Sequence, residues 1–165
     1  MKQLLKKFKN FRLTAIIEAI LGVVVVIAAL VLLILYQTNQ TRYNPATDEM
    51  NNIPGFPGNP LAGMVFFLAG LLAIIFAVVA VYTSLPFIFK KDEKLEPNKL
   101  IPYFGAASGV FALVEVIFAF VMTTLEGSRH TVPIIIFAVV LILGLVCQLA
   151  MLYPAITVRI VKDDE

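Results

Sequence analysis

The chain has 165 residues, of which 60% are hydrophobic and 15% are charged. A soluble domain of this length carries roughly a quarter charged residues and about half apolar ones, so this composition indicates a protein that folds in lipid. The formal net charge of +2 is small, and the basic residues flank the apolar runs. That placement favours a role in membrane topology over nucleic-acid binding, and we expect no nucleic-acid partner.

Four long apolar runs predict four transmembrane helices. Each is close to the ~20 residues needed to cross ~30 Å of hydrocarbon, where only regular structure satisfies the backbone. The predicted helices cover residues 15–36, 61–83, 101–123 and 133–153. We therefore expect an all-α integral membrane protein forming a single compact four-helix bundle, with an outer loop at 37–60 and an inner loop at 84–100.

Basic residues fall almost entirely on one side of this predicted bundle. Eleven Lys and Arg residues lie in the N-terminal segment, the second loop and the tail, against Arg42 and Arg129 on the other side. Because cytoplasmic flanks are enriched in Lys and Arg, we predict a multi-pass protein of the cell membrane with both termini cytoplasmic. The first apolar run is longer than a signal-peptide core of ~7–15 residues, so we expect it to remain as a helix.

The outer loop is rich in proline, which excludes a long helix there. Its prolines are Pro45, Pro54, Pro57 and Pro60. The segment IPGFPG predicts consecutive turns that display Phe56 between two Pro-Gly steps. We expect Phe56 to pack on the membrane surface or on the protein's own outer end, and contact with a partner is the alternative.

The chain offers few groups for catalysis or metal binding. It has one Cys, Cys147, and one His, His130. A single thiol excludes an internal disulfide and a cysteine-based metal site, and we expect Cys147 to be buried and inert. The sequence also has no spacing typical of a Ser/His/Asp set and no glycine loop for phosphate. We therefore predict no enzymatic activity, no metal and no cofactor.

The third predicted helix gathers polar and small residues on one face. At 100° per residue, Glu115 shares a stripe with Ser108, Gly105 and Gly109. The other members of the stripe are Ala112, Ala119 and Thr123. The neighbouring edge carries Phe104, Phe111 and Phe118 at heptad spacing. Since Gly105 to Gly109 is a GxxxG motif, which lets another helix approach closely, we expect Glu115 to face protein rather than lipid.

Two acids lie within the predicted spans. Glu18 is about one turn from the cytoplasmic end of its helix, so we expect it to reach the interface and meet Arg12 or another basic residue. Glu115 is predicted to lie close to the membrane midplane, slightly toward the outer side, and no Lys or Arg is at its depth. Acids inside a membrane are candidates for function. The structural alternative is a neutral Glu115 that donates a hydrogen bond to the backbone of a neighbouring helix.

The sequence favours an accessory or assembly subunit that packs against a larger membrane protein complex. The candidate contacts are the small-residue faces around Glu115 and Glu18, and the expected partners are membrane lipid and either another integral membrane protein or further copies of the chain. The alternative is a small oligomeric transporter or channel in which Glu115 takes up a proton or cation. The scarcity of other polar residues in the spans counts against transport.

Overall fold

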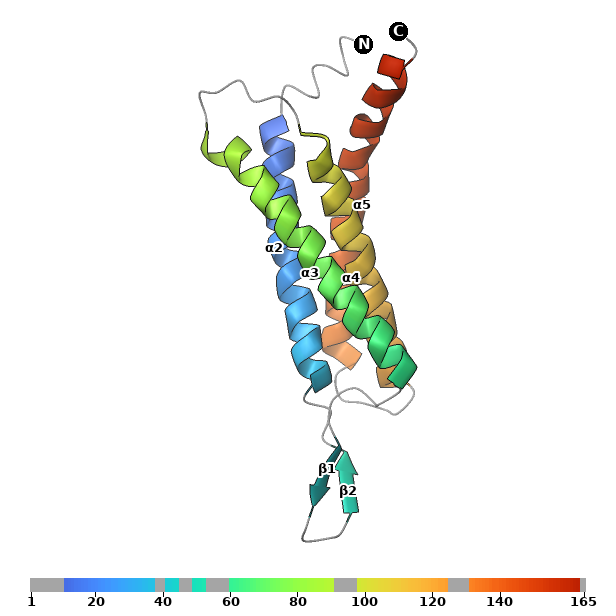
Figure 1. Ribbon diagram of the computed structural model, residues 1–165. Coiled ribbons are helices and arrows are strands. Elements are labelled where there is room, and N and C mark those ends of the chain that lie inside the picture. The colour runs from blue at the N-terminus through green and yellow to red at the C-terminus, as the bar shows by residue number, and fades with distance from the viewer. Residues whose placement is uncertain are drawn as a thin grey trace.

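The computed structural model describes residues 11–37, 41–44, 49–52, 60–90, 98–124 and 131–163. In chain order the elements are α2 (Phe11–Gln37), β1 (Thr41–Asn44), β2 (Glu49–Asn52), α3 (Pro60–Phe89), α4 (Leu100–Thr124) and α5 (Thr131–Asp163). All four helices are long and apolar enough to cross a membrane. The prediction of a bundle of four transmembrane helices is thereby confirmed (Figure 1).

A short β-hairpin lies in the segment that the sequence predicted to be an outer loop without a long helix. β1 pairs antiparallel with β2, with Thr41 opposite Asn52 and Asn44 opposite Glu49. The hairpin projects beyond the end of the bundle where α2 ends and α3 begins (Figure 1). None of the eight paired residues is a proline, so each has a backbone N–H group. The predicted display of Phe56 lies outside the described residues.

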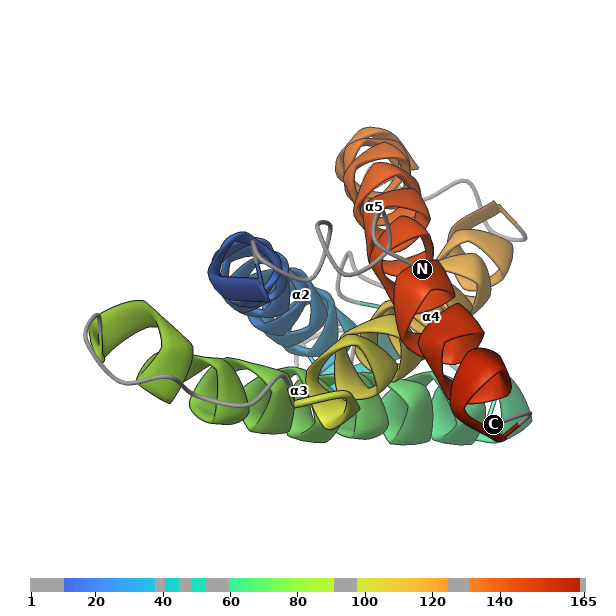
Figure 2. The ribbon, with the colours of Figure 1, turned by 90° about the horizontal axis from the view of Figure 1, so that it is seen from above.

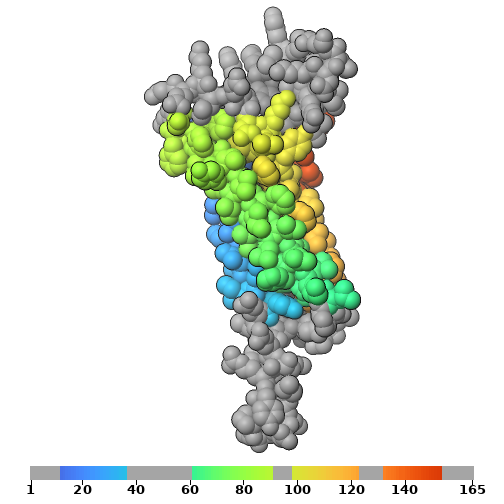
Figure 3. Space-filling view, viewed as in Figure 1, coloured from blue at the N-terminus to red at the C-terminus, as the bar shows by residue number. Residues whose placement is uncertain are grey.

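The helices run alternately up and down, so α2 begins and α5 ends at the same end of the bundle (Figure 1). α3 packs against both α2 and α4, and α4 also packs against α5. α5 contacts α2 only slightly. Seen from above, the first part of α5 lies on the side of the bundle away from α3 (Figure 2). In the space-filling view α3 runs obliquely along the face of the bundle (Figure 3). The architecture is therefore a three-helix core with α5 attached mainly to α4.

Each helix turns a narrow seam of residues toward its neighbours. Buried positions recur at steps of three and four residues, which is the spacing of a left-handed helical bundle. The seam of α2 includes Ala15, Glu18, Gly22, Val25, Ala29 and Leu32. The seam of α4 includes Ile101, Gly105, Ser108, Ala112, Glu115, Ala119 and Met122. On α5 the buried residues are Ile134, Leu141 and Gln148, one in each heptad.

α3 contributes the smallest side chains to the interior. Its buried residues include Ala69, Gly70, Ala73, Ala77 and Ala80. Small residues let helix backbones come close in lipid, where packing contacts rather than the hydrophobic effect hold helices together. Phe66 is the large exception; it is fully buried, and its ring centroid is 5.1 Å from that of Tyr36 on α2. α3 therefore forms the closely packed centre of the core.

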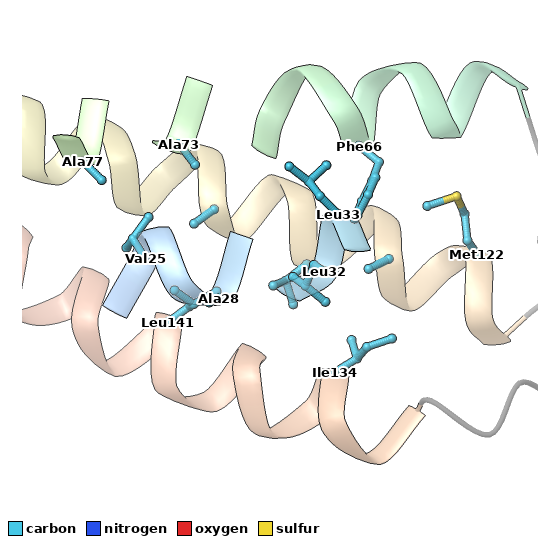
Figure 4. Packing of buried hydrophobic residues seen from close by; sticks show 13 residues of the cluster. Val25, Ala28, Leu32, Leu33, Phe66, Ala73, Ala77, Met122, Ile134 and Leu141 are labelled. Carbon is cyan, nitrogen blue, oxygen red and sulfur yellow. The ribbon is translucent and has the colours of Figure 1, made fainter. Parts of the chain in front are cut away.

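Larger apolar side chains fill the space between the seams (Figure 4). Leu32 and Leu33 of α2 lie in the middle of the cluster, with Phe66 on one side and Ile134 of α5 on the other. Because these side chains come from three different helices, the cluster ties α5 to the core near the end of the bundle that carries the hairpin.

An aromatic stack joins α3 to α4. The ring of Phe76 lies 6.0 Å from that of Phe104 and 5.6 Å from that of Phe111, with interplanar angles of 24° and 7°. Stacked aromatic pairs at these separations add to the stabilisation that area burial provides. Two of the phenylalanines on the predicted edge of the third span thus contact a neighbouring helix.

α3 is longer than the sequence predicted, because it continues through Pro86 to Phe89. Proline removes one backbone donor from a helix, a loss that is tolerated in membrane helices when nearby groups or water compensate. Beside it, Ser84 Oγ donates to the carbonyl of Ala80 at 2.6 Å, and Lys90 N donates to the carbonyl of Pro86 at 3.0 Å. The predicted inner loop at 84–100 is accordingly reduced to the residues between Phe89 and Leu100.

Candidate functional site

Three polar side chains lie in the bundle interior and have almost no exposed surface. Glu18 and Glu115 are 0% exposed, and Gln148 is 1% exposed. None of their side-chain oxygen and nitrogen atoms has a hydrogen-bond partner among the described residues. By contrast, the buried hydroxyls of Ser84 and Ser108 donate to carbonyls of their own helices. Among the described residues, the two acids and the amide are therefore the buried polar groups that lack a hydrogen-bond partner.

Each of these three side chains lies against a glycine of a neighbouring helix. Oε2 of Glu18 occupies the space that a Cβ atom on Gly105 would need, and Oε1 of Gln148 does the same at Gly109. A Cβ atom on Gly70 would lie only 2.7 Å from Oε1 of Glu115. These separations leave no room for a methyl group. The glycines thus create the space in which the polar groups lie.

Glu18 is fully buried and has no hydrogen-bond partner among the described residues, so the predicted contact with Arg12 is wrong. Glu18 belongs to the buried seam of α2 and points at Gly105 on α4. Arg12 instead donates a hydrogen bond of 3.2 Å to the carbonyl of Ile88 near the end of α3. The prediction considered the depth of Glu18 in the membrane. The rotation of the helix, however, decides whether a side chain points outward or inward.

Gln148 of α5 is a polar neighbour of Glu18. The amide lies beside the carboxyl group, although the two do not form a hydrogen bond of good geometry. The glycines that they contact, Gly105 and Gly109, are one helical turn apart on α4. No role for Gln148 was predicted from the sequence. The missed signal is its seven-residue spacing from Leu141, which places both residues on the same face of α5.

Glu115 lies in a different and less polar environment. It faces Gly70 of α3, and Cδ2 of Leu33 would be 3.3 Å from a Cβ atom at position 70. Glu115 is fully buried, and the protein surface that it meets belongs to this chain. The described residues contain no group of three or more His, Cys, Asp or Glu side chains that could hold a metal ion.

The remaining candidates have structural positions. Ser108 is buried, and its hydroxyl donates to the carbonyl of Gly105 on the same helix at 2.7 Å. Because Gly105 meets Glu18 of α2 and Gly109 meets Gln148 of α5, the GxxxG stripe contacts helices of the same chain. The prediction that Cys147 is buried is wrong, because the thiol is exposed on the side of α5 that no other described helix covers. The side chain of Thr123 and the whole of His130 lie outside the described part of the structure.

The fold and its enclosed polar residues define a multi-pass membrane bundle whose outward surfaces are apolar. A family model described as the 4TM region of DNA translocase FtsK/SpoIIIE matches residues 11–160, and the chain belongs to this family. The match includes all four membrane-spanning helices. No curated protein and no solved structure shows a significant match to the chain.

Proposed function

We propose that the chain is a membrane-embedded assembly subunit that packs against a larger integral membrane protein. The observation that carries this proposal is the one-sided packing of α5. Of its described side chains, only Ile134, Leu141 and Gln148 are buried. Its most exposed aliphatic residues include Val132, Ile136, Leu143 and Val146. An apolar face of this breadth is available either to lipid or to another membrane helix.

The family supports the choice of a protein partner. Its description concerns a four-helix membrane region of DNA translocases, which is one part of a protein with further activities. From that description we extend to this chain only the role of a membrane-embedded part of a larger assembly. Since Glu18, Glu115 and Gln148 are enclosed, contact with the partner would form in the lipid phase mainly through apolar surfaces.

Affinity purification from membranes in mild detergent, followed by mass analysis, tests the proposal. We expect a larger membrane protein in stoichiometric amount, and a DNA translocase in that position would connect the chain to DNA transport. Recovery of the chain alone contradicts the proposal. Val146→Trp on α5 should reduce partner recovery, whereas the matched Val78→Trp on the exposed face of α3 should leave recovery unchanged; these valines are 58% and 51% exposed.

Proton- or cation-coupled transport is a second candidate. One observation favours it: Glu115 is fully buried, and neither carboxyl oxygen has a hydrogen-bond partner among the described residues. Acids in such positions often belong to ion pathways. In liposomes that contain the purified chain, transport predicts a proton or cation flux that falls when Glu115→Gln is introduced. No flux with the unmodified chain, or an unchanged flux with the variant, contradicts transport.

A further inference from the structure

We propose that Glu18 and Gln148 form an interhelical polar clasp that fixes the rotation and register of α5 against α2 and α4. Both side chains are buried, and the amide of one lies beside the carboxyl group of the other. They approach α4 from two different helices and meet it at glycines one turn apart. At this pair, polar side chains of α2 and α5 therefore meet each other and the backbone of α4.

The two groups have complementary hydrogen-bonding capacity. The amide of Gln148 donates through Nε2 and accepts at Oε1, and a carboxyl group accepts whether it is neutral or ionised. The neutral acid can also donate to Oε1, so the clasp forms in either state. No described residue is hydrogen-bonded to these atoms, so each group is available to the other. In the clasp, Nε2 of Gln148 donates to the carboxyl group of Glu18, which gives both buried groups a partner in the apolar interior.

α5 needs such a determinant because its other contacts specify rotation weakly. Its seam residues Ile134 and Leu141 are apolar, but so is nearly all of the surface that faces outward. Lipid tails are as apolar as leucine. A rotation of α5 about its axis would therefore exchange one apolar face for another with little change in free energy. Gln148 is the only strongly polar residue among the described side chains of α5. A single polar residue at one seam position is known to fix register in coiled coils.

The clasp acts over a long distance because α5 is a continuous helix. At 1.5 Å per residue it continues for about 22 Å from Gln148 to Asp163. A rotation of α5 at Gln148 therefore redirects the whole final segment of the helix, at the end of the bundle where α2 begins. The clasp concerns contacts within one chain, so it holds whether or not the outer face of α5 binds a partner.

Labelling of a buried cysteine on α5 tests the clasp in the purified chain. In a Cys147→Ala background, Leu141→Cys places a thiol at a position that is 3% exposed. A maleimide reaches this thiol only when α5 separates from the core, so the labelling rate reports the opening equilibrium. Ala73→Cys, at a position on α3 that is 0% exposed, reports opening of the core itself and serves as the matched control.

Gln148→Leu should raise the labelling rate at position 141 about three- to tenfold, the effect of losing one interhelical hydrogen bond in a membrane. The rate at position 73 should not change. The exchange variant Glu18→Gln with Gln148→Glu keeps the pair and should restore the original rate. Glu115→Leu, which removes a buried acid elsewhere, should have no effect at position 141.

Three results would overturn the proposal. The first is an unchanged rate at position 141 in Gln148→Leu. The second is an equal rise at positions 73 and 141, which would show that Gln148 supports the whole bundle and not α5 in particular. The third is an exchange variant that labels as fast as Gln148→Leu, because the pair itself would then have no role.

Discussion

Glu115 on α4 lies directly over Gly70 on α3. A Cβ atom at position 70 would lie 2.7 Å from Oε1 and 2.9 Å from Cδ of Glu115. Both distances are shorter than nonbonded carbon contacts in folded proteins, which favour separations of about 3.5–4.0 Å. The acid and the glycine therefore depend on each other: the carboxyl group can occupy the interior only because the facing helix has no side chain there.

Gly70→Ala is therefore expected to destabilise the bundle, even though alanine is the better helix former. The added methyl group must displace Glu115 within a packed interior, and such overpacking costs about 1–3 kcal/mol in the free energy of unfolding. Titration with a denaturing detergent, followed by circular dichroism, measures the loss. Glu115→Ala should recover most of it in the double variant. Strictly additive effects of the two substitutions would contradict the contact.

Gly22→Ala should also destabilise the bundle, here by forcing α2 away from α3. The new Cβ atom would lie 2.7 Å from Cγ2 of Val81 and 3.2 Å from the carbonyl oxygen of Ala77. A β-branched side chain and a backbone oxygen cannot move aside easily, so we expect a loss of about 1–3 kcal/mol. In the matched control Gly144→Ala, the Cβ atom meets only Cδ2 of Leu21, at 3.4 Å, and stability should change by less than about 0.5 kcal/mol. Equal losses in thermal unfolding of the two variants would contradict this explanation.

Arg12→Ala should loosen the last turn of α3 with little effect on the rest of the fold. The guanidinium group donates to the carbonyl of Ile88, two residues after Pro86. Because this hydrogen bond is exposed, its loss should lower the free energy of unfolding by less than about 1 kcal/mol. Amide hydrogen exchange should become faster near Lys90 and stay unchanged in the centre of α3. Unchanged exchange near Lys90 would show that Arg12 does not hold this turn.

The orientation of the bundle remains a prediction from the distribution of basic residues. Single cysteines in a Cys147→Ala background test it, with Asn51→Cys in β2 and Lys99→Cys just before α4. A membrane-impermeant maleimide should label position 51 in intact cells and position 99 only after the membrane is permeabilised. The reverse pattern would place both termini outside.

The interior face of α4 was predictable because polar residues mark it. Counting 100° per residue from Glu115 identified Gly105, Ser108 and Ala112, and all of these are buried. The faces of α3 and α5 were harder to predict, since apolar residues surround both helices and a helix in lipid need not hide them. Among the described side chains of α5, only Gln148 is strongly polar. Its heptad relation to Leu141 was present in the sequence, but a single polar residue does not reveal which helix it meets.

Other features could not be read from the sequence, for identifiable physical reasons. The strands Thr41–Asn44 and Glu49–Asn52 lack the alternation of apolar and polar residues that marks a half-buried strand. The orientation of Glu18 depends on the rotation of α2, which is set by contacts with α3 and α4, such as that of Gly22 with Val81 and that of Glu18 with Gly105. Membrane depth follows from counting residues, whereas rotation follows from tertiary packing.

The small side chains of α3 have a consequence for the entropy of folding. Alanine and glycine have no side-chain torsions to restrict, so the close contacts of Ala73 and Ala77 with their neighbours form without any loss of rotamer freedom. Long polar side chains such as Glu115 and Gln148 lose about 1.5–2 kcal/mol each when they are fixed. The small side chains of α3 therefore lose less entropy on folding than Glu115 and Gln148, the long polar groups that lie against glycines.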